Sequence, residues 1–274
     1  MFHWFKKDND VVEEIVETPK VDFANFHKIA EFIYVQCGIT DLEKRILSFS
    51  WLKKYALDNN IHSTDEFLYL LNQKGKIYQD AINIVTVNET YFFREKKELE
   101  YLVEFIENSS KKLKILSLPC SSGEEIYSIL IMMFQKNIPL DKVTIIGYDI
   151  DLQMIEKAKR AIYNEYSLHN LSQDIRESYF TQTDNKTFQI KSFLQQQVEF
   201  KQQNIFEIDI KYEYYDVILS RNMMIYFDDI KRKEAIEIIT KSLKRGGIFI
   251  KGHADLFNRS IMLQNLSFGI YKKI

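Results

Sequence analysis

The residues that could do chemistry in this chain begin with a short polar segment, residues 121–125 (Ser-Ser-Gly-Glu-Glu). It follows an apolar run at 115–118 and precedes an apolar helical pattern. A strand, a turn of small residues and a helix N-terminus together offer free backbone N–H groups to a nucleotide-type ligand. Glu125 could face an ammonium group of that ligand. Alternatively, because Ser122 and Glu125 have the spacing of a capping box, Glu125 could cap the helix.

An acidic residue ends the next apolar stretch. Residues 143–148 predict a strand, and Asp149 follows it, 24 positions after Glu125. A carboxylate at such a strand end can accept hydrogen bonds from both hydroxyls of a ribose. The alternative is that Asp149 or Asp151 only caps the following helix. The spacing favours Asp149 as the ligand-binding acid and Asp151 as the cap.

Three polar residues, Asn88, Thr90 and Arg94, lie just before the predicted α/β part of the chain, and they are spaced two and four positions apart. That spacing could place them on one side of a turn. Arginine stays protonated and can bind a carboxylate through two N–H groups. An isolated arginine is usually only a solvated charge, but Phe92 and Phe93 precede Arg94, and we expect them to be buried and to hold it in place.

A third polar group follows the predicted strand at 216–220. Open α/β sheets bind ligands at the carboxyl ends of their strands. There Arg221 could neutralise a substrate acid, Asn222 could hydrogen-bond the ligand, and Tyr226 could border the reacting group. For Tyr226, a place in the apolar core is an equally good interpretation.

Composition excludes several classes of protein. The chain has 274 residues, a net charge of −2 and a pI of about 6.3, which disfavours a nucleic-acid binder, including an RNA-modifying enzyme. Two cysteines and five scattered histidines show no metal-binding spacing, so we expect no metal site. There is no run of about 18 apolar residues, so we expect a cytoplasmic protein that does not insert into a membrane.

The pattern of apolar residues divides the chain into three parts. Residues 1–22 are charged and predict a flexible N-terminal tail. Residues 23–90 have helical periodicity and predict an all-helical domain. Residues 91–274 alternate strands and helices, which predicts an α/β fold with a parallel sheet. A small strand-rich insertion is predicted near 180–202, and its strand pattern is clearest at 188–200. The glycine pair at 246–247 is expected to end a helix.

Together these motifs resemble those of the CheR family, the chemotaxis receptor protein-glutamate O-methyltransferases. The likeness covers roughly residues 25–274, and Gly252-His-Ala-Asp255 is similar to the last conserved block of the family. It is specific in four segments: Asn88-Glu-Thr-Tyr-Phe-Phe-Arg-Glu95, Ser121-Ser-Gly-Glu-Glu-Ile-Tyr-Ser-Ile129, Tyr148-Asp-Ile-Asp151 and Arg221-Asn-Met-Met-Ile-Tyr-Phe227.

The resemblance implies a class I, Rossmann-like methyltransferase domain that uses S-adenosylmethionine (SAM) and yields S-adenosylhomocysteine. It implies methyl transfer to glutamate carboxylates on the cytoplasmic helices of transmembrane chemoreceptors, by an enzyme we expect to be monomeric. Arg94, Arg221 and Tyr226 would surround the methyl group and the acceptor. The implied ligand contacts are Asn88, Thr90, Arg94, Glu125, Asp149, Asn204, Ile205, Asn222 and Met223.

The chain departs from the family pattern in three places. The helix at 50–55 carries Trp51 where an arginine is usual, Pro119 and Cys120 replace small residues in the first ligand loop, and residues 1–22 have no counterpart. Two other functions stay open from the sequence. One is a signalling module that only binds SAM or its product, and the other is a class I methyltransferase with a different protein or small-molecule acceptor.

Overall fold

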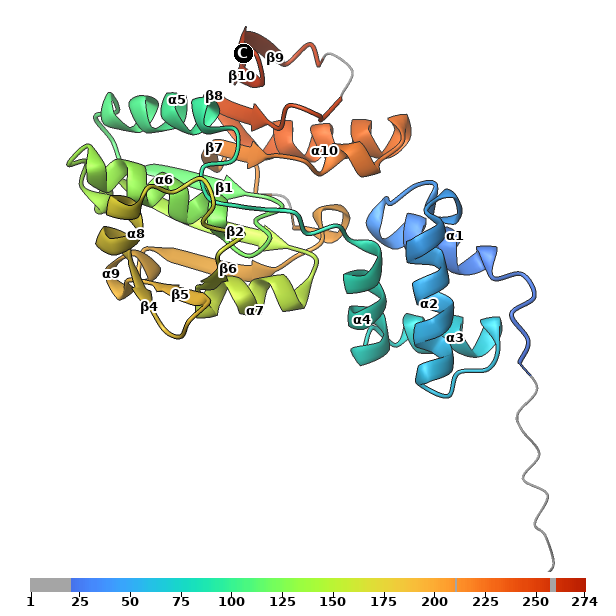
Figure 1. Cartoon of the computed structure of the whole chain (residues 1–274). Coiled ribbons are helices and arrows are strands. Elements are labelled where there is room, and N and C mark those ends of the chain that lie inside the picture. Colours follow the sequence, from blue (N-terminus) through green and yellow to red (C-terminus); the bar gives the residue numbers. More distant parts are fainter. Residues whose placement is uncertain (1–20, 210, 257–259) are drawn as a thin grey trace, which may run out of the picture.

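A helical part and an α/β part lie side by side in the computed structural model, which describes residues 21–209, 211–256 and 260–274 (Figure 1). The predicted flexible tail lies outside the described residues except for residues 21 and 22. Asp22 is fixed to the helical part: its N–H donates to the His62 carbonyl at 2.7 Å, and its own carbonyl accepts from the Thr64 N–H at 3.1 Å.

The helical part forms its own apolar core from Ile29, Ile33, Leu52, Phe67 and similar residues. Ser63 caps α3, since its hydroxyl accepts from the Glu66 N–H at 3.2 Å. The elements are α1 (His27–Cys37), the 3₁₀ turn η1 (Leu42–Lys44), α2 (Ile46–Asp58), α3 (Thr64–Asn72) and α4 (Lys76–Val85).

The α/β part is built on a seven-stranded sheet in the order β6-β2-β1-β7-β8-β10-β9. The first five strands are parallel, and β10 runs antiparallel to both of its neighbours. Its strands are β1 (Leu113–Ser117), β2 (Val143–Asp149), β6 (Val198–Gln202), β7 (Tyr215–Ser220), β8 (Leu243–Lys251), β9 (Leu263–Ser267) and β10 (Ile270–Lys273). The predicted parallel α/β sheet is therefore present.

Helices cover both faces of this sheet because its buried strands are apolar on both sides. Ile115 and Val217 point to the face covered by α5 (Lys96–Glu107), α6 (Glu124–Gln135) and α7 (Leu152–Arg160). Leu116 and Ile218 point to the opposite face, against α10 (Asp229–Ser242). Four 3₁₀ or short helical turns lie in the connections: η2 (Leu140–Lys142), α9 (Ser192–Gln195), η3 (Ile205–Glu207) and η4 (Met224–Tyr226).

The predicted β-insertion exists but has other limits than the sequence suggested. A separate three-stranded antiparallel sheet, in the order β3-β5-β4, forms from β3 (Ile162–Asn164), β4 (Phe180–Gln182) and β5 (Thr187–Ile190), with α8 (Gln173–Tyr179) between β3 and β4. Residues 198–200, assigned to the insertion from sequence, instead belong to β6, which pairs parallel to β2. Their partner lies about 50 positions earlier in the chain, so no local pattern distinguished the two sheets.

The prediction that the glycine pair at 246–247 ends a helix is wrong, because both glycines lie within strand β8. Helix α10 already ends at Ser242, and Gly246 has φ +75° within the strand. The pairing of β7 with β8 shifts here, from Tyr215 opposite Leu243 to Val217 opposite Ile248. Five steps along β8 here oppose two along β7, so this is an irregular bulge, in which Gly246 supplies a left-handed conformation.

Polar contacts join the helical part to the α/β part. Asn204 Nδ2 donates to the Gln36 carbonyl at 2.7 Å, and the Thr40 N–H donates to the Tyr226 carbonyl at 3.0 Å. In the described part of the chain, every helix is too short or too polar to cross a membrane.

Candidate active site

A pocket lies where the helical part meets the carboxyl ends of β1, β2 and β7. All of the residues predicted to bind ligand or to act in the reaction line this pocket: Asn88, Thr90, Arg94, Glu125, Asp149, Asn204, Ile205, Arg221, Asn222, Met223 and Tyr226. They come from the α4–α5 linker, from the carboxyl ends of β2, β6 and β7 and the segments that follow them, and from the first turn of α6. The topology therefore brings together segments that the sequence shows far apart.

The turn between β1 and α6 forms one wall of the pocket. Ser121 has φ +45°, and its N–H donates to Asp149 Oδ2 at 2.8 Å. The Ser121 hydroxyl is enclosed and has no hydrogen-bond partner among the described residues. A buried hydroxyl without a partner is unfavourable, and here it lines the pocket, where a polar ligand would supply one.

Asp149 ends β2 and is only 3% exposed. Its second oxygen accepts from the Asp151 N–H at 2.9 Å. Burial raises the pKa of Asp149 to about 6, although these backbone N–H groups oppose the rise. Asp151 caps α7 as predicted, because its Oδ1 accepts from the Gln153 N–H at 2.8 Å.

Glu125 does not cap α6. The Ser122 hydroxyl instead donates to Glu124, at 2.9 and 2.7 Å, and Glu124 is fully buried, which raises its pKa. Glu125 accepts from the Ser117 hydroxyl at 2.8 Å and from Arg221 Nη1 at 2.7 Å. It thus faces the pocket as half of an ion pair.

Arg221 is not the free cation that the sequence suggested. Its side chain is 4% exposed, and it donates to Glu125, to Glu95 Oε2 at 3.1 and 3.3 Å, and to the Arg94 carbonyl at 2.6 Å. These contacts occupy four of its five N–H donors. Two carboxylates already neutralise it, so it is poorly suited to bind a substrate acid.

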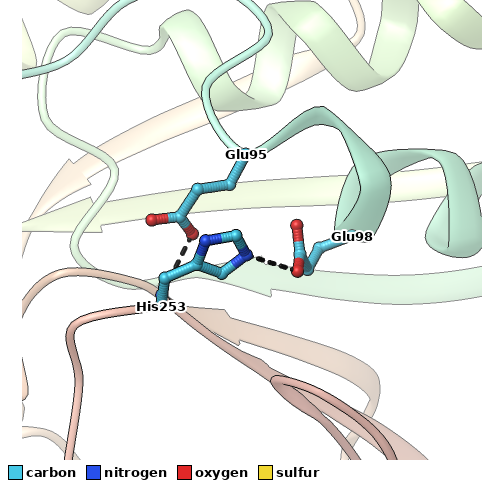
Figure 2. A group of neighbouring side chains, drawn as sticks. All are labelled: Glu95, Glu98 and His253. Atoms are coloured by element: carbon cyan, nitrogen blue, oxygen red, sulfur yellow. Dashed lines mark hydrogen bonds and ion pairs between the residues drawn. The ribbon is translucent and has the colours of Figure 1, made fainter.

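Glu95 extends this network away from the pocket (Figure 2). Its Oε2 also accepts from the His253 N–H at 3.2 Å, and the His253 Nε2 lies 2.6 Å from Glu98 Oε1. The potential ligand atoms of Glu95, Glu98 and His253 lie within 4.8 Å of one another. Because Arg221 already holds Glu95, we interpret this group as part of the arginine network rather than as a metal site.

Arg94 and Tyr226 are the other two residues expected around the acceptor. Phe92 and Phe93 are buried, as predicted, and position Arg94, whose Nη1 donates to the Glu89 carbonyl. Arg94 is half-buried and has no carboxylate partner within ion-pair distance among the described residues. Tyr226 lines the pocket and also packs against both the helical core and the core around α10, so both interpretations of this residue hold.

Two amides serve as anchors as well as pocket lining. Asn88 Nδ2 donates to Asp151 Oδ2 at 2.8 Å, and Asn204 Oδ1 accepts from the Phe206 N–H at 3.1 Å. The Asn222 N–H donates to the buried Asp255 at 2.5 Å, and Asp255 also accepts from the Met224 N–H at 2.8 Å. Asp255 therefore shapes the loop after β7.

Sequence reasoning missed several lining residues. Cys37 and Ile39, at the end of the first helix, line the pocket from the helical part. Sequence reasoning also missed Glu95, which pairs with Arg221 and so offsets its positive charge. No local pattern marks Cys37 or Ile39, because they join the site only through the packing of the two parts. Glu95 lay inside a recognised motif, but its role depends on Arg221, 126 positions later.

The sheet order, the acidic end of β2 and the pocket at the strand ends define a class I SAM-dependent methyltransferase. Comparison with known families agrees: a family model described as "CheR methyltransferase, SAM binding domain" matches residues 88–270. The chain therefore belongs to the CheR methyltransferase family, and SAM is its cofactor.

Full-length relatives support the same assignment. Chemotaxis protein methyltransferase 2 of Vibrio cholerae is 34% identical over 262 residues, covering 90% of this chain and 89% of the relative. The chemotaxis protein methyltransferase of Campylobacter jejuni is 30% identical over 256 residues, covering 93% and 96%. That of Escherichia coli is 28% identical, covering 89% and 88%. The family and cofactor predicted from the sequence are thus confirmed.

Proposed function

We propose that this enzyme methylates glutamate side chains on the cytoplasmic helices of transmembrane chemoreceptors and forms glutamate methyl esters. The relatives are named for chemotaxis protein methylation. The observation that carries the proposal is the pocket itself, where Arg94, a cation without a carboxylate partner among the described residues, lies near the acids suited to SAM. We expect the enzyme to act as a cytoplasmic monomer.

The residues of the pocket fit the cofactor. Asp149 offers a buried carboxylate to the ribose hydroxyls, and Glu125 offers one to the ammonium group. The enclosed Ser121 hydroxyl gains a partner when a polar ligand binds. We propose Asn88, Thr90, Asn204, Ile205, Asn222 and Met223 as further contacts.

The reaction needs alignment more than acid–base catalysis. A glutamate side chain has a pKa of about 4.3, so it is already an anion at neutral pH. SAM, when bound, supplies a methyl group on a sulfonium, and the neutral thioether of S-adenosylhomocysteine is a good leaving group. Arg94 would orient the carboxylate without gripping it, and Tyr226 would border the methyl. Holding two reactants in this way can contribute about 7–11 kcal/mol.

Transfer of a labelled methyl group tests the proposal. The enzyme is mixed with labelled SAM and receptor-containing membranes, and the labelled band is treated with mild alkali. We expect label on a receptor-sized band that is released as methanol, which identifies a carboxyl methyl ester. The matched control is Asp149→Asn, which should bind SAM poorly and transfer little.

Two results would contradict the proposal. Alkali-stable label would indicate a different acceptor atom. Intact SAM binding without transfer to any receptor would favour a module that only senses SAM or its product. In that case α2 would be the first candidate surface for a signalling partner, because Trp51 is 54% exposed there and Ile46 and Leu47 are also exposed.

A further inference from the structure

Arg45, at the start of α2, places a charged side chain against the pocket wall. The centre of its guanidinium lies 4.7 Å from the centroid of the Tyr226 ring. Its Nη1 is enclosed and has no hydrogen-bond partner, and its side chain has no carboxylate within ion-pair distance in the part of the chain that the structure describes. The ring face of a tyrosine attracts such a cation, so Arg45 and the Tyr226 ring stabilise each other's positions.

The acidic residues that line the pocket would repel an incoming carboxylate unless a cation offsets their charge. The acceptor is a carboxylate, and it must approach a pocket that Glu89, Glu125 and Asp149 also line. Arg221 cannot offset it, because Glu95 and Glu125 already neutralise Arg221. Among the arginines that line the pocket, that leaves Arg94.

Tyr226 is the residue through which Arg45 can act on the site. Its carbonyl accepts from the Thr40 N–H at 3.0 Å and from the Thr40 hydroxyl at 3.3 Å, so the helical part fixes both its backbone and its ring. Burial raises the pKa of the Tyr226 phenol, and the positive charges of Arg45 and Arg94 oppose that rise. The two arginines therefore act on the same side chain.

We propose that Arg45 is a positioning residue for the transfer step. It holds the Tyr226 ring in place and, with Arg94, supplies the positive charge that an incoming glutamate carboxylate needs. This role rests on the proposed function and extends it, because it makes the helical part a contributor to the reaction. Arg45 acts on the acceptor and leaves SAM binding unaffected.

Three variants of the full-length enzyme separate charge from packing. Arg45→Gln removes the charge but keeps a polar side chain of similar length, and Arg45→Lys keeps the charge. Lys44→Gln is the matched control: Lys44 is adjacent, exposed and paired with Asp41 at 2.6 Å. For each we would measure kcat and KM for receptor membranes by methanol release, and the Kd for SAM by calorimetry. Arg45→Met replaces Arg45→Gln if the latter unfolds.

We expect Arg45→Gln to lower kcat/KM for the receptor about tenfold, with the Kd for SAM changed less than about twofold. Arg45→Lys should recover much of that loss, and Lys44→Gln should resemble the unaltered enzyme. Equal losses in the Gln and Lys variants would show a packing role only and overturn the proposal. So would an Arg45→Gln enzyme that matches Lys44→Gln, or a parallel loss of SAM affinity. Absence of transfer by the unaltered enzyme would overturn the proposed function first, and this role with it.

Discussion

At the scale of single residues, the charge of the pocket depends on Arg221. Its guanidinium is buried between Glu95 and Glu125, and its remaining contact is the Arg94 carbonyl. Both carboxylates are themselves mostly enclosed, with side chains 13% exposed. A buried charge that loses its partner is strongly unfavourable, whereas a half-exposed arginine can be removed at little cost to stability.

Arg221 and Arg94 should therefore respond differently to truncation. We expect Arg221→Ala to lower the free energy of unfolding by about 3–5 kcal/mol, because it leaves two buried carboxylates without their cation. Arg94→Ala should change unfolding little and remove most methyl transfer. Urea unfolding and the methanol-release assay measure the two effects. An Arg94→Ala enzyme with near-normal turnover would remove Arg94 from the mechanism.

The raised pKa of Asp149 predicts how SAM binding depends on pH. The carboxylate form accepts the ribose hydroxyls, and it predominates above the pKa of about 6. Affinity should be highest above pH 7 and should fall as the pH drops through 6, by at most about tenfold per unit. Calorimetric titration from pH 5 to 8 measures this. Asp149→Asn is the control, and a pH-dependent affinity in that variant would assign the effect to another group.

At the scale of elements, Asp151 connects helix α7 to the pocket. One of its oxygens caps the helix, and the other accepts from Asn83 at 2.9 Å and from Asn88 at 2.8 Å. Asn88 lines the pocket and Asn83 lies on α4. A single carboxylate thus ties a helix of the α/β part to the linker and to the helical part.

Removing this cap should affect stability and binding together. Asp151→Ala is expected to lower the free energy of unfolding by about 1 kcal/mol or more and to weaken SAM binding, because Asn88 loses its anchor. Ser172→Ala is the matched control, since Ser172 caps α8 and is not among the residues that line the pocket. Unfolding and calorimetry should show a loss of stability alone for Ser172→Ala. Unchanged SAM affinity in Asp151→Ala would disprove the link.

The sequence predicted strands well where a run of apolar residues marks the whole element. Strands β2 and β7 lie within one residue of the positions predicted for them, 143–148 and 216–220. The errors arose where a distant partner decides the outcome. Strand β6 joins the main sheet because β2 pairs with it, and the bulge at Gly246 is set by the register against β7.

The same division applies to the site. Strand ends and the small-residue turn identified Glu125, Asp149 and Asn222, because the carboxyl ends of parallel strands meet at one edge. The resemblance to the family added Asn204, Ile205 and Met223. The ion pairs of Arg221 could not be predicted, since Glu125 and Glu95 lie 96 and 126 positions earlier in the chain.

At the scale of the whole molecule, the pocket is shared between the helical part and the α/β part. Cys37 and Ile39 contribute from the first, and Asp149 and Arg221 from the second. The two parts also hydrogen-bond directly through Thr40 and Tyr226.

A ligand bound in this pocket should stabilise both parts as one unit. We expect a single thermal transition that shifts upward with S-adenosylhomocysteine, equivalent to about 2.7 kcal/mol at a ligand concentration 100 times the Kd. Differential scanning calorimetry measures the shift, and Asp149→Asn should show little of it. Two transitions, of which only one moves, would mean that the helical part is not coupled to the site.

The linker between α4 and α5 is both the covalent connection between the two parts and a wall of the pocket. Seven of its residues line the site: Thr86, Val87, Asn88, Glu89, Thr90, Tyr91 and Arg94. A rotation of the helical part would displace these residues, so occupancy of the pocket and the angle between the parts are thermodynamically linked. The same rotation would carry α2 with it, so a ligand that holds this wall of the pocket would also restrain the orientation of α2.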